Sequence, residues 1–169
     1  MTPVLLGLGA NIGDRRQTIR AALDGLAPFA RISAVSALYE TAPMYVTDQE
    51  SFINICAVVE TDLAPRELLH AVKALERALG RMPSRRFGPR QIDIDIIMYG
   101  DAEIAEDDLQ IPHPRVLERA FVLVPAVDVA ADWIHPVAGR TIRGLAADLG
   151  ESPDVVCVGD AASLLTVPV

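Results

Sequence analysis

The chain has few of the residues that would place it in several large classes of protein. Lys73 is its only lysine, and its two cysteines, Cys56 and Cys157, are far apart in the sequence. Neither cysteine has a partner at the spacing of metal ligands, which argues against a zinc site and against a disulfide-stabilised secreted scaffold. We therefore expect both cysteines to be buried apolar residues.

Long hydrophobic runs are also missing. No stretch approaches the ~20 consecutive apolar residues that a membrane-spanning helix needs. The first residues, "MTPVLLGLGANIGDR", contain neither a basic leader nor an apolar region followed by a cleavage site. These features predict a cytoplasmic protein with no membrane partner.

Positive charge is scarce, with 15 Lys and Arg against 23 Asp and Glu and a net charge of −8. Nucleic-acid binding needs a broad basic face, so we expect no nucleic-acid partner. The arginines are nevertheless concentrated in one stretch, "RMPSRRFGPR", over residues 81–90. One arginine-rich loop in an otherwise acidic chain indicates a binding site for a small polyanion.

What the chain does have is the composition of one globular domain. It is 51% hydrophobic and 22% charged over 169 residues, values at which a single core forms. No internal repeat, low-complexity linker or change in composition divides it. We predict one domain over residues 1–169, and a monomer.

Hydrophobic spacing predicts an α+β fold. Apolar or alternating runs predict strands over 2–9, 31–40, 51–62 and 91–100, and helical spacing predicts helices over 14–30 and 64–80. Asp14 is suited to cap the first helix, and Pro65 and Gly80 to begin and end the second. A short helix is expected near 141–150. This order of elements predicts a ferredoxin-like sandwich, a mainly antiparallel sheet with helices on one face.

Two acids lie one residue apart in the strand "QIDIDIIMYG". On a helix, Asp93 and Asp95 would point about 200° apart, but on a strand they share a face with Cα atoms about 6.6 Å apart. Ile92, Ile94 and Ile96 would then face the core. Two such carboxylates can hold one divalent ion or bridge a pair of ions.

An exposed polar face would explain the same alternation without any function. Two physical facts weigh against it, since aspartate is a poor strand former and like charges on one face repel unless a cation separates them. The arginine-rich loop also runs directly into this strand. Magnesium together with arginines is a common way to hold polyphosphate.

Other motifs give weaker evidence for a function. The run "GLGANIGD" lacks the third glycine of a dinucleotide fingerprint, because Ile12 stands where it is needed, and we interpret the run as a tight turn. His113 lies between two prolines in "IPHPR", a rigid setting that suits an oriented ligand, although a lone histidine in a turn is more often structural. His70 and His135 have no supporting neighbours.

The run "RFGPRQIDIDIIMYG" is similar to the signature of the hydroxymethyl-dihydropterin pyrophosphokinase family of folate biosynthesis. In that signature a basic loop leads through Gly-Pro-Arg into Asp-apolar-Asp. The runs "GLGANIGDR", "YETAPMYVTDQESFINICAVVET" and "IPHPRVLERAFVLVPAVDVA" resemble further blocks of the family, from about Val4 to Thr141. The resemblance implies transfer of pyrophosphate from ATP to the hydroxymethyl group of a reduced pterin, with release of AMP.

The resemblance also implies roles for individual residues. Asp93 and Asp95 would bind two Mg²⁺ ions, and Arg81 and Arg90 would contact the phosphates as charge develops on them. The implied ATP site contains Lys73, Glu76, Arg85, Arg86, Ile96, His113 and Arg119. The implied pterin side contains Thr41, Ala42, Pro43, Met44, Phe52, Asn54 and Phe121.

This division of residues fits the chemistry of the two substrates, because two aromatic rings can sandwich a flat bicycle and an asparagine can bond its amide edge. The chain also departs from the family pattern. Its basic loop is about two residues shorter than in some relatives, Phe87 stands where a tryptophan is frequent, and Phe52 where a tyrosine occurs. Asp108 stands where some members have a basic residue near the nucleotide.

Two alternatives remain at this point. A different magnesium-dependent phosphoryl or nucleotidyl transferase could use the same acid pair, and would release ADP or free pyrophosphate instead of AMP. A non-catalytic ferredoxin-like module could bind a small effector, and would need neither magnesium nor acids facing arginines.

Overall fold

The computed structural model describes residues 1–41, 51–80 and 92–165, and a six-stranded sheet forms its centre. The strand order is β5-β1-β4-β3-β8, with β2 paired to β4, and every described pair is antiparallel. The strands are β1 (Thr2–Ala10), β2 (Arg31–Val35), β3 (Leu38–Thr41), β4 (Phe52–Thr61), β5 (Asp93–Tyr99) and β8 (Val155–Gly159). The fold class is the predicted ferredoxin-like α+β sandwich.

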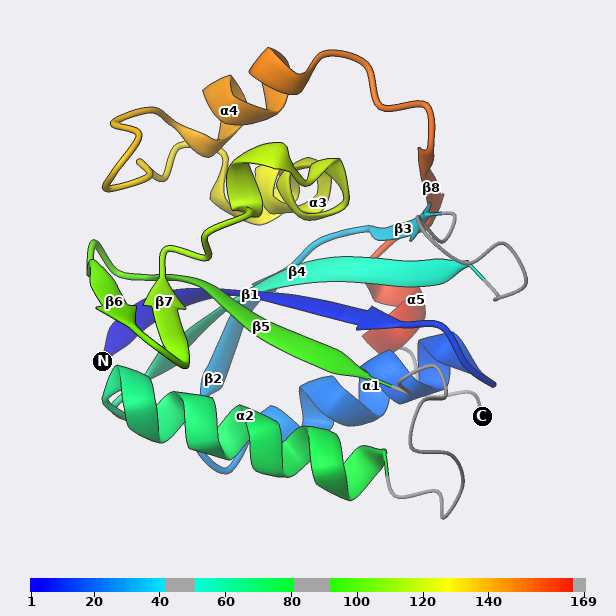
Figure 1. The fold of residues 1–169 in the computed structure, drawn as a ribbon. Helices are drawn as coiled ribbons and strands as arrows, with labels where there is room; N and C mark the ends of the chain where they lie inside the picture. Colours follow the sequence, from blue (N-terminus) through cyan, green and yellow to red (C-terminus); the bar gives the residue numbers. More distant parts are fainter. Residues whose placement is uncertain (42–50, 81–91, 166–169) are drawn as a thin grey trace.

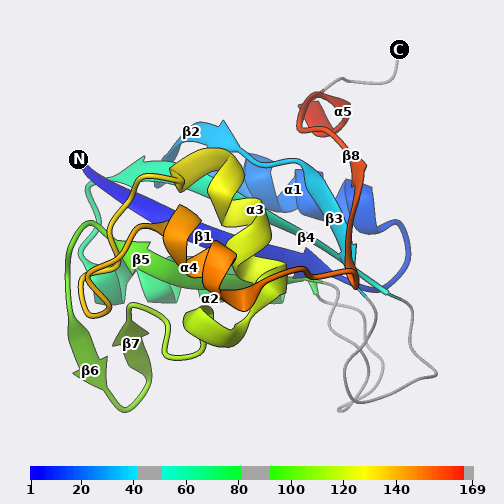
Figure 2. The same ribbon diagram turned by 90° about the horizontal axis from the view of Figure 1, so that it is seen from above.

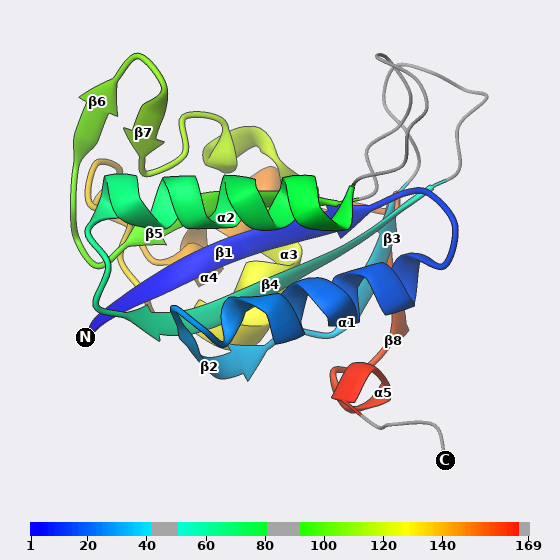
Figure 3. The same cartoon turned by 90° about the horizontal axis from the view of Figure 1, so that it is seen from below.

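Helices cover both faces of this sheet. Figures 1 and 3 show α1 (Arg15–Leu26) and α2 (Pro65–Leu79) on one face. Figures 1 and 2 show α3 (Ala120–Ala130) and α4 (Ile142–Leu149) on the other. The prediction that helices occupy one face was therefore wrong. The segment 120–130 is apolar nearly all round, which hides helical periodicity, and it packs as a helix between the sheet and α4.

Strand alternation divides the interior into two cores. Val4, Leu6 and Leu8 of β1 point toward α1 and α2, together with Ile94 and Ile96 of β5. The core on the α3 and α4 side contains Leu5, Cys56, Ile97, Met98, Leu123 and Ala126. Successive residues of a strand point to opposite faces, so one apolar strand can serve both cores.

The first two helices begin as their sequences predict. Asp14 caps α1, because its side chain accepts a hydrogen bond from the Gln17 backbone N–H at 3.1 Å. Pro65 is the first residue of α2, where its missing N–H costs nothing, and Leu68 and Val72 of the predicted stripe are fully buried. Both helices present one apolar face to the same core.

Other predicted elements differ in detail. The single strand expected over 31–40 is two strands, β2 and β3, and the predicted order therefore lacked one strand. The C-terminal part forms β8 and a short helix α5 (Ala162–Leu165), which the sequence did not indicate. A two-stranded hairpin, β6 (Ile104–Glu106) and β7 (Leu109–Ile111), and the 3-10 turn η1 (Val116–Glu118) complete the described elements.

The two cysteines have different environments. Cys56 is fully buried in β4, and burial raises the pKa of its thiol. Cys157 is exposed on β8, so the prediction that both are buried was wrong for this residue. Strand β8 is the last strand of the described sheet, and its side chains are less covered than those of the central strands. Among the described residues, no helix combines the length and apolar character needed to cross a bilayer.

Candidate active site

The two acids of β5 lie on one face of the sheet, as predicted. Asp93 and Asp95 are partly exposed on the α3 side, whereas Ile92, Ile94 and Ile96 are buried on the α1 and α2 side. The strand is therefore amphipathic, with a carboxylate face and an isoleucine face. Its carboxylate face is the starting point of the site.

The neighbouring strand places glycines opposite both acids. Gly7 of β1 pairs with Asp95, and Gly9 pairs with Asp93. These glycines are in the interior of the strand expected over 2–9, and the tight turn expected in "GLGANIGD" follows them, between strand and helix. Chain reversal begins only after Ala10, and Gly13 adopts φ +63° there. A glycine inside a strand frequently marks a place where another group approaches the backbone closely.

Here the approaching group is the side chain of Asn54. Gly9 pairs with Asn54 on β4, and a Cβ on Gly9 would lie 2.7 Å from Asn54 Oδ1. Asn54 Nδ2 also donates to Thr41 Oγ1 at 2.8 Å, and both residues are 8% exposed. The register thus places Asp93, Gly9 and Asn54 in one row across three strands.

A helix supports the acid strand at its open edge. Glu76 of α2 accepts a hydrogen bond from the backbone N–H of Ile94, the residue between the acids, at 2.6 Å. Its other oxygen forms an ion pair with Lys73 at 3.1 Å. Glu76 therefore bonds an edge-strand N–H, which no neighbouring strand pairs, and it fixes Lys73 near β5.

His113 joins the site through a local irregularity of β5. Leu5 pairs with Met98 and Leu6 with Ile96, so Ile97 is an extra residue in the ladder. The carbonyl of Ile97 accepts a hydrogen bond from the His113 backbone N–H at 2.9 Å. Bulges of this kind are common next to active sites, where they redirect a segment of chain.

The charge state of His113 follows from its contacts. Burial is the main cause that lowers its pKa, and the positive charges of Arg119, Arg115 and Lys73 add to it, while Asp95 opposes them. Its Nδ1 accepts from the Arg115 backbone N–H at 3.2 Å, which requires an unprotonated Nδ1. His113 is therefore neutral near pH 7 with its proton on Nε2.

Arg119 and Phe121 come from the start of α3. The Arg119 guanidinium lies over the Phe121 ring, 5.4 Å from its centroid, a cation–π distance. Phe121 also packs against the core on the α3 side. The stacking of Phe121 with Phe52 around a pterin stays a prediction.

The remaining predicted residues have mixed outcomes. The side chain of Ile96 is buried in the core on the α1 side, which leaves its backbone as the part that a nucleotide could contact. Asp108 is held by a two-pronged ion pair with Arg66, and this bond lowers the pKa of its carboxyl group. The predicted residues outside the described parts of the chain are Arg81, Arg85, Arg86, Arg90, Ala42, Pro43 and Met44.

The fold and this site define an α+β sandwich domain with an acid pair on one face of its sheet. The profile of the 7,8-dihydro-6-hydroxymethylpterin-pyrophosphokinase family matches residues 5–131. The chain belongs to this family.

Individual relatives agree with the family match. The chain is similar to 2-amino-4-hydroxy-6-hydroxymethyldihydropteridine pyrophosphokinase of Methylorubrum extorquens, with 44% identity over 90% of this chain and 96% of the relative. It is 42% identical to the folic acid synthesis protein of Dictyostelium discoideum over 86% of this chain and 22% of that protein. In fold it resembles a crystal structure of Plasmodium falciparum HPPK-DHPS, with TM-score 0.73, 18% identity, and 87% and 44% of the two chains covered.

Proposed function

We propose that this chain transfers the pyrophosphoryl group of ATP to the hydroxymethyl oxygen of 6-hydroxymethyl-7,8-dihydropterin. In this reaction the pterin hydroxyl oxygen attacks the β-phosphorus and releases its proton to solvent, the bond from that phosphorus to the α–β bridging oxygen breaks, and AMP leaves. Membership of the family supports the reaction. The observation that carries the proposal is the row from Asp93 across Gly9 to Asn54. This row places a carboxylate and a side-chain amide that can hydrogen-bond a pterin on one face of the sheet, with one strand between them.

Magnesium belongs to this proposal. Asp93 and Asp95 are oxygen ligands on one face of a strand and are partly exposed, which suits Mg²⁺, since this ion takes one or two carboxylates and completes its shell with water and phosphate oxygens. These two residues would hold two ions. When bound, the ions would neutralise phosphate charge in the transition state.

The described side chains divide into two groups. Lys73, His113 and Arg119 supply donors or positive charge, and the charges of Lys73, Arg119 and Asp95 all act on His113, so we assign the first three to the phosphates of ATP. A neutral His113 with its proton on Nε2 can donate a hydrogen bond to a phosphate oxygen. Asn54, Thr41 and Phe52 form the pterin side, where the Asn54 amide can pair with the ring edge.

We further propose that this single domain acts as a cytoplasmic monomer on its two small-molecule substrates. In the described parts of the chain, α1, α2 and α3 pack on one sheet and α4 packs on α3, which supports a single folding unit. Size-exclusion chromatography with light scattering tests the monomer, and a dimer would correct it.

The reaction is tested by incubating the protein with ATP, Mg²⁺ and 6-hydroxymethyl-7,8-dihydropterin. We expect AMP and pterin pyrophosphate in equal amounts, and none without the pterin. ADP would indicate an ordinary kinase, and free pyrophosphate would indicate a nucleotidyl transferase. Ligand binding without turnover, and without a need for Mg²⁺, would indicate an effector-binding module.

A further inference from the structure

Arg15, the first residue of α1, contacts two segments that are distant in sequence. Its Nη1 donates to the backbone carbonyl oxygen of Ser51 at 2.6 Å, and its Nη2 lies 3.6 Å from Glu40 Oε2. The Arg15 side chain is only 25% exposed. We call these three residues the Arg15 bridge.

The bridge lies next to one pair of the β3–β4 ladder. Thr41 and Phe52 form the last described pair of this ladder, so Glu40 directly precedes Thr41 and Ser51 directly precedes Phe52. Arg15 therefore contacts both strands next to two residues of the pterin side.

The bridge acts from the reverse face of the sheet. Glu40 pairs with Ile53, whose side chain is buried in the core under α1, so Glu40 points toward α1 as well. Thr41 points to the opposite face, where its hydroxyl accepts from Asn54. Arg15 thus holds the backbone that carries Thr41 and Phe52, and it does not share their face.

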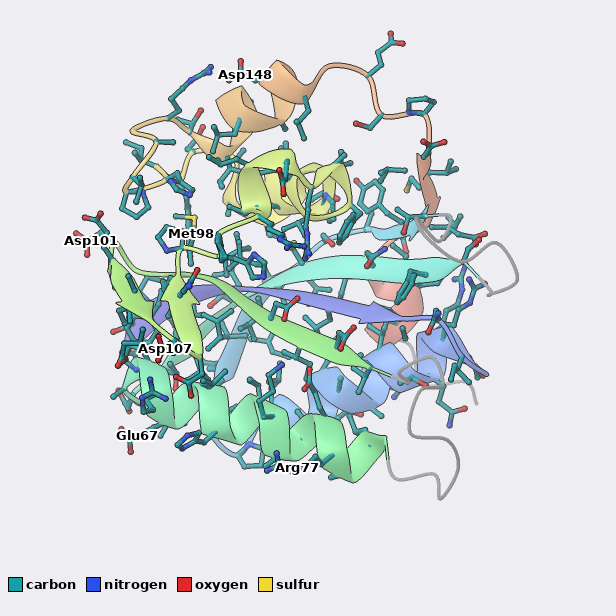
Figure 4. All side chains as sticks on the ribbon, in the orientation of Figure 1. Glu67, Arg77, Met98, Asp101, Asp107 and Asp148 are labelled. Atoms are coloured by element: carbon teal, nitrogen blue, oxygen red, sulfur yellow. The ribbon has the colours of Figure 1, made fainter. Side chains whose placement is uncertain are left out.

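The position of Arg15 has an electrostatic cost. The N-terminus of a helix carries partial positive charge and favours acids. Helix α2 obeys this rule, with Glu67 in its first turn and Arg77 in its last (Figure 4). Helix α1 instead begins with Arg15 and Arg16 and has no acid in its first turn. A side chain placed against the local field indicates that it has another role.

The turn before α1 directs Arg15 to this position. Gly13 adopts φ +63°, a left-handed conformation that other residues rarely take, and Asp14 caps the helix immediately after it. This accounts for Gly13, Asp14 and Arg15, which neither the acid pair nor the pterin contacts explained.

We propose that Arg15 is a positioning residue for the pterin: through Ser51 and Glu40 it fixes Phe52 and Thr41 in the geometry that binds the ring. This inference rests on the proposed pyrophosphokinase function. It assigns to Arg15 an effect on pterin affinity and none on the nucleotide, because strands β1 and β4 separate the acid strand β5 from β3, which carries the Glu40 that Arg15 contacts.

Steady-state kinetics of Arg15→Ala, with Arg16→Ala as matched control, tests the proposal. Arg16 is the next residue of the same helix, and its Nη2 donates to the Val158 carbonyl oxygen of β8 at 2.9 Å, away from the pterin side. We expect Arg15→Ala to raise the KM for the pterin about ten-fold, while the KM for ATP changes less than about two-fold. Arg16→Ala should leave both values unchanged.

Two further variants keep the test decisive. Arg15→Lys retains a charge but lacks the two-pronged fork, so the pterin KM should rise by an intermediate factor. Glu40→Gln should raise it less than Arg15→Ala, and these two variants carry the comparison should Arg15→Ala fail to fold. An unchanged pterin KM, an equal rise for both substrates, or the same effect in Arg16→Ala would overturn the proposal. Pterin-dependent AMP release by the wild type separates this result from failure of the proposed function.

Discussion

The two faces of the sheet differ along the same two strands. On the α1 and α2 face, side chains of β1 and β5 are apolar and buried along the whole length, from Val4 to Ala10 and from Ile92 to Ile96. On the other face, apolar packing covers only one end, where Leu5, Ile97 and Met98 lie against α3. The other end has two glycines opposite two aspartates.

We infer that, within each of these two strands, one face stabilises the fold and the other face carries the candidate site. The continuous face is packed against α1 and α2. The interrupted face gives up apolar burial over half its length, which is free energy that a purely structural sheet would retain. We propose that the interruption marks the functional end of the molecule.

The largest expected effect comes from comparing a substitution on the carboxylate face of β5 with one on its isoleucine face. Asp95→Asn or Asp93→Asn should lower the rate at least about a thousand-fold, because a lost metal ligand removes several kcal/mol of transition-state stabilisation. Folding should be retained. The matched control, Ile94→Val, should cost about 0.5–1.5 kcal/mol of unfolding free energy and leave the rate near normal. Near-normal turnover of Asp95→Asn would refute the metal assignment.

A methyl group added at Gly9, in the row from Asp93 to Asn54, should have the next largest effect. Gly9→Ala would place a Cβ 2.7 Å from Asn54 Oδ1, so Asn54 must move and its bond to Thr41 is weakened. We expect a loss of about 1–3 kcal/mol in pterin binding, measured by calorimetry. Gly7→Ala is the control, since its Cβ would meet Ile97 at an ordinary 3.4 Å. Equal losses in both variants would mean that general packing, and not Asn54, is responsible.

A smaller change at Glu76 tests how the acid strand is held. Glu76→Gln keeps an acceptor for the Ile94 N–H but loses the charge that pairs with Lys73. The expected cost is about 0.5–1.5 kcal/mol in ATP binding, with little change in pterin binding. Glu67→Gln, on the exposed start of α2, is the control. A Glu76→Gln protein with unchanged ATP affinity would restrict Glu76 to a structural role.

The smallest expected effect concerns the α3 and α4 layer and its response to acid. His135 is buried, burial lowers its pKa, and its Nδ1 accepts from the backbone N–H groups of Val137 and Ala138. The unfolded chain binds a proton near pH 6.5 while the folded chain resists it, so stability should fall as the pH drops below about 6.5. His135→Asn keeps an acceptor without titrating. Its unfolding free energy should fall less over that pH range, as followed by denaturant titration, and parallel curves would exclude His135 as a cause.

The acid face of β5 could be predicted from the sequence because a period of two needs no knowledge of distant residues. The same holds for α2, whose stripe, first proline and terminal glycine are local signals. The role of Gly9 could not be predicted, because it depends on Asn54, a residue on another strand. A glycine in the interior of an apolar run was the available signal.

Other errors have similar physical causes. The segment 120–130 lacks a polar stripe because it is covered on several sides, so its helix shows no periodicity. Strand β8 is short and, among the described strands, pairs with β3 alone at a sheet edge, so tertiary contacts determine it. The sequence signal for Arg15 is a basic residue at the start of a helix, where its charge opposes the helix dipole.

The most direct measurement of the central claim follows the phosphorus atoms of ATP. With ATP labelled at the β-phosphorus, Mg²⁺ and 6-hydroxymethyl-7,8-dihydropterin, the label should appear in the pterin product, and unlabelled AMP should form in the same amount. Asp95→Asn protein should transfer no label. If the β-label stayed with the nucleotide as ADP in the wild-type reaction, the acid face of β5 would serve a different transfer and the account would be contradicted.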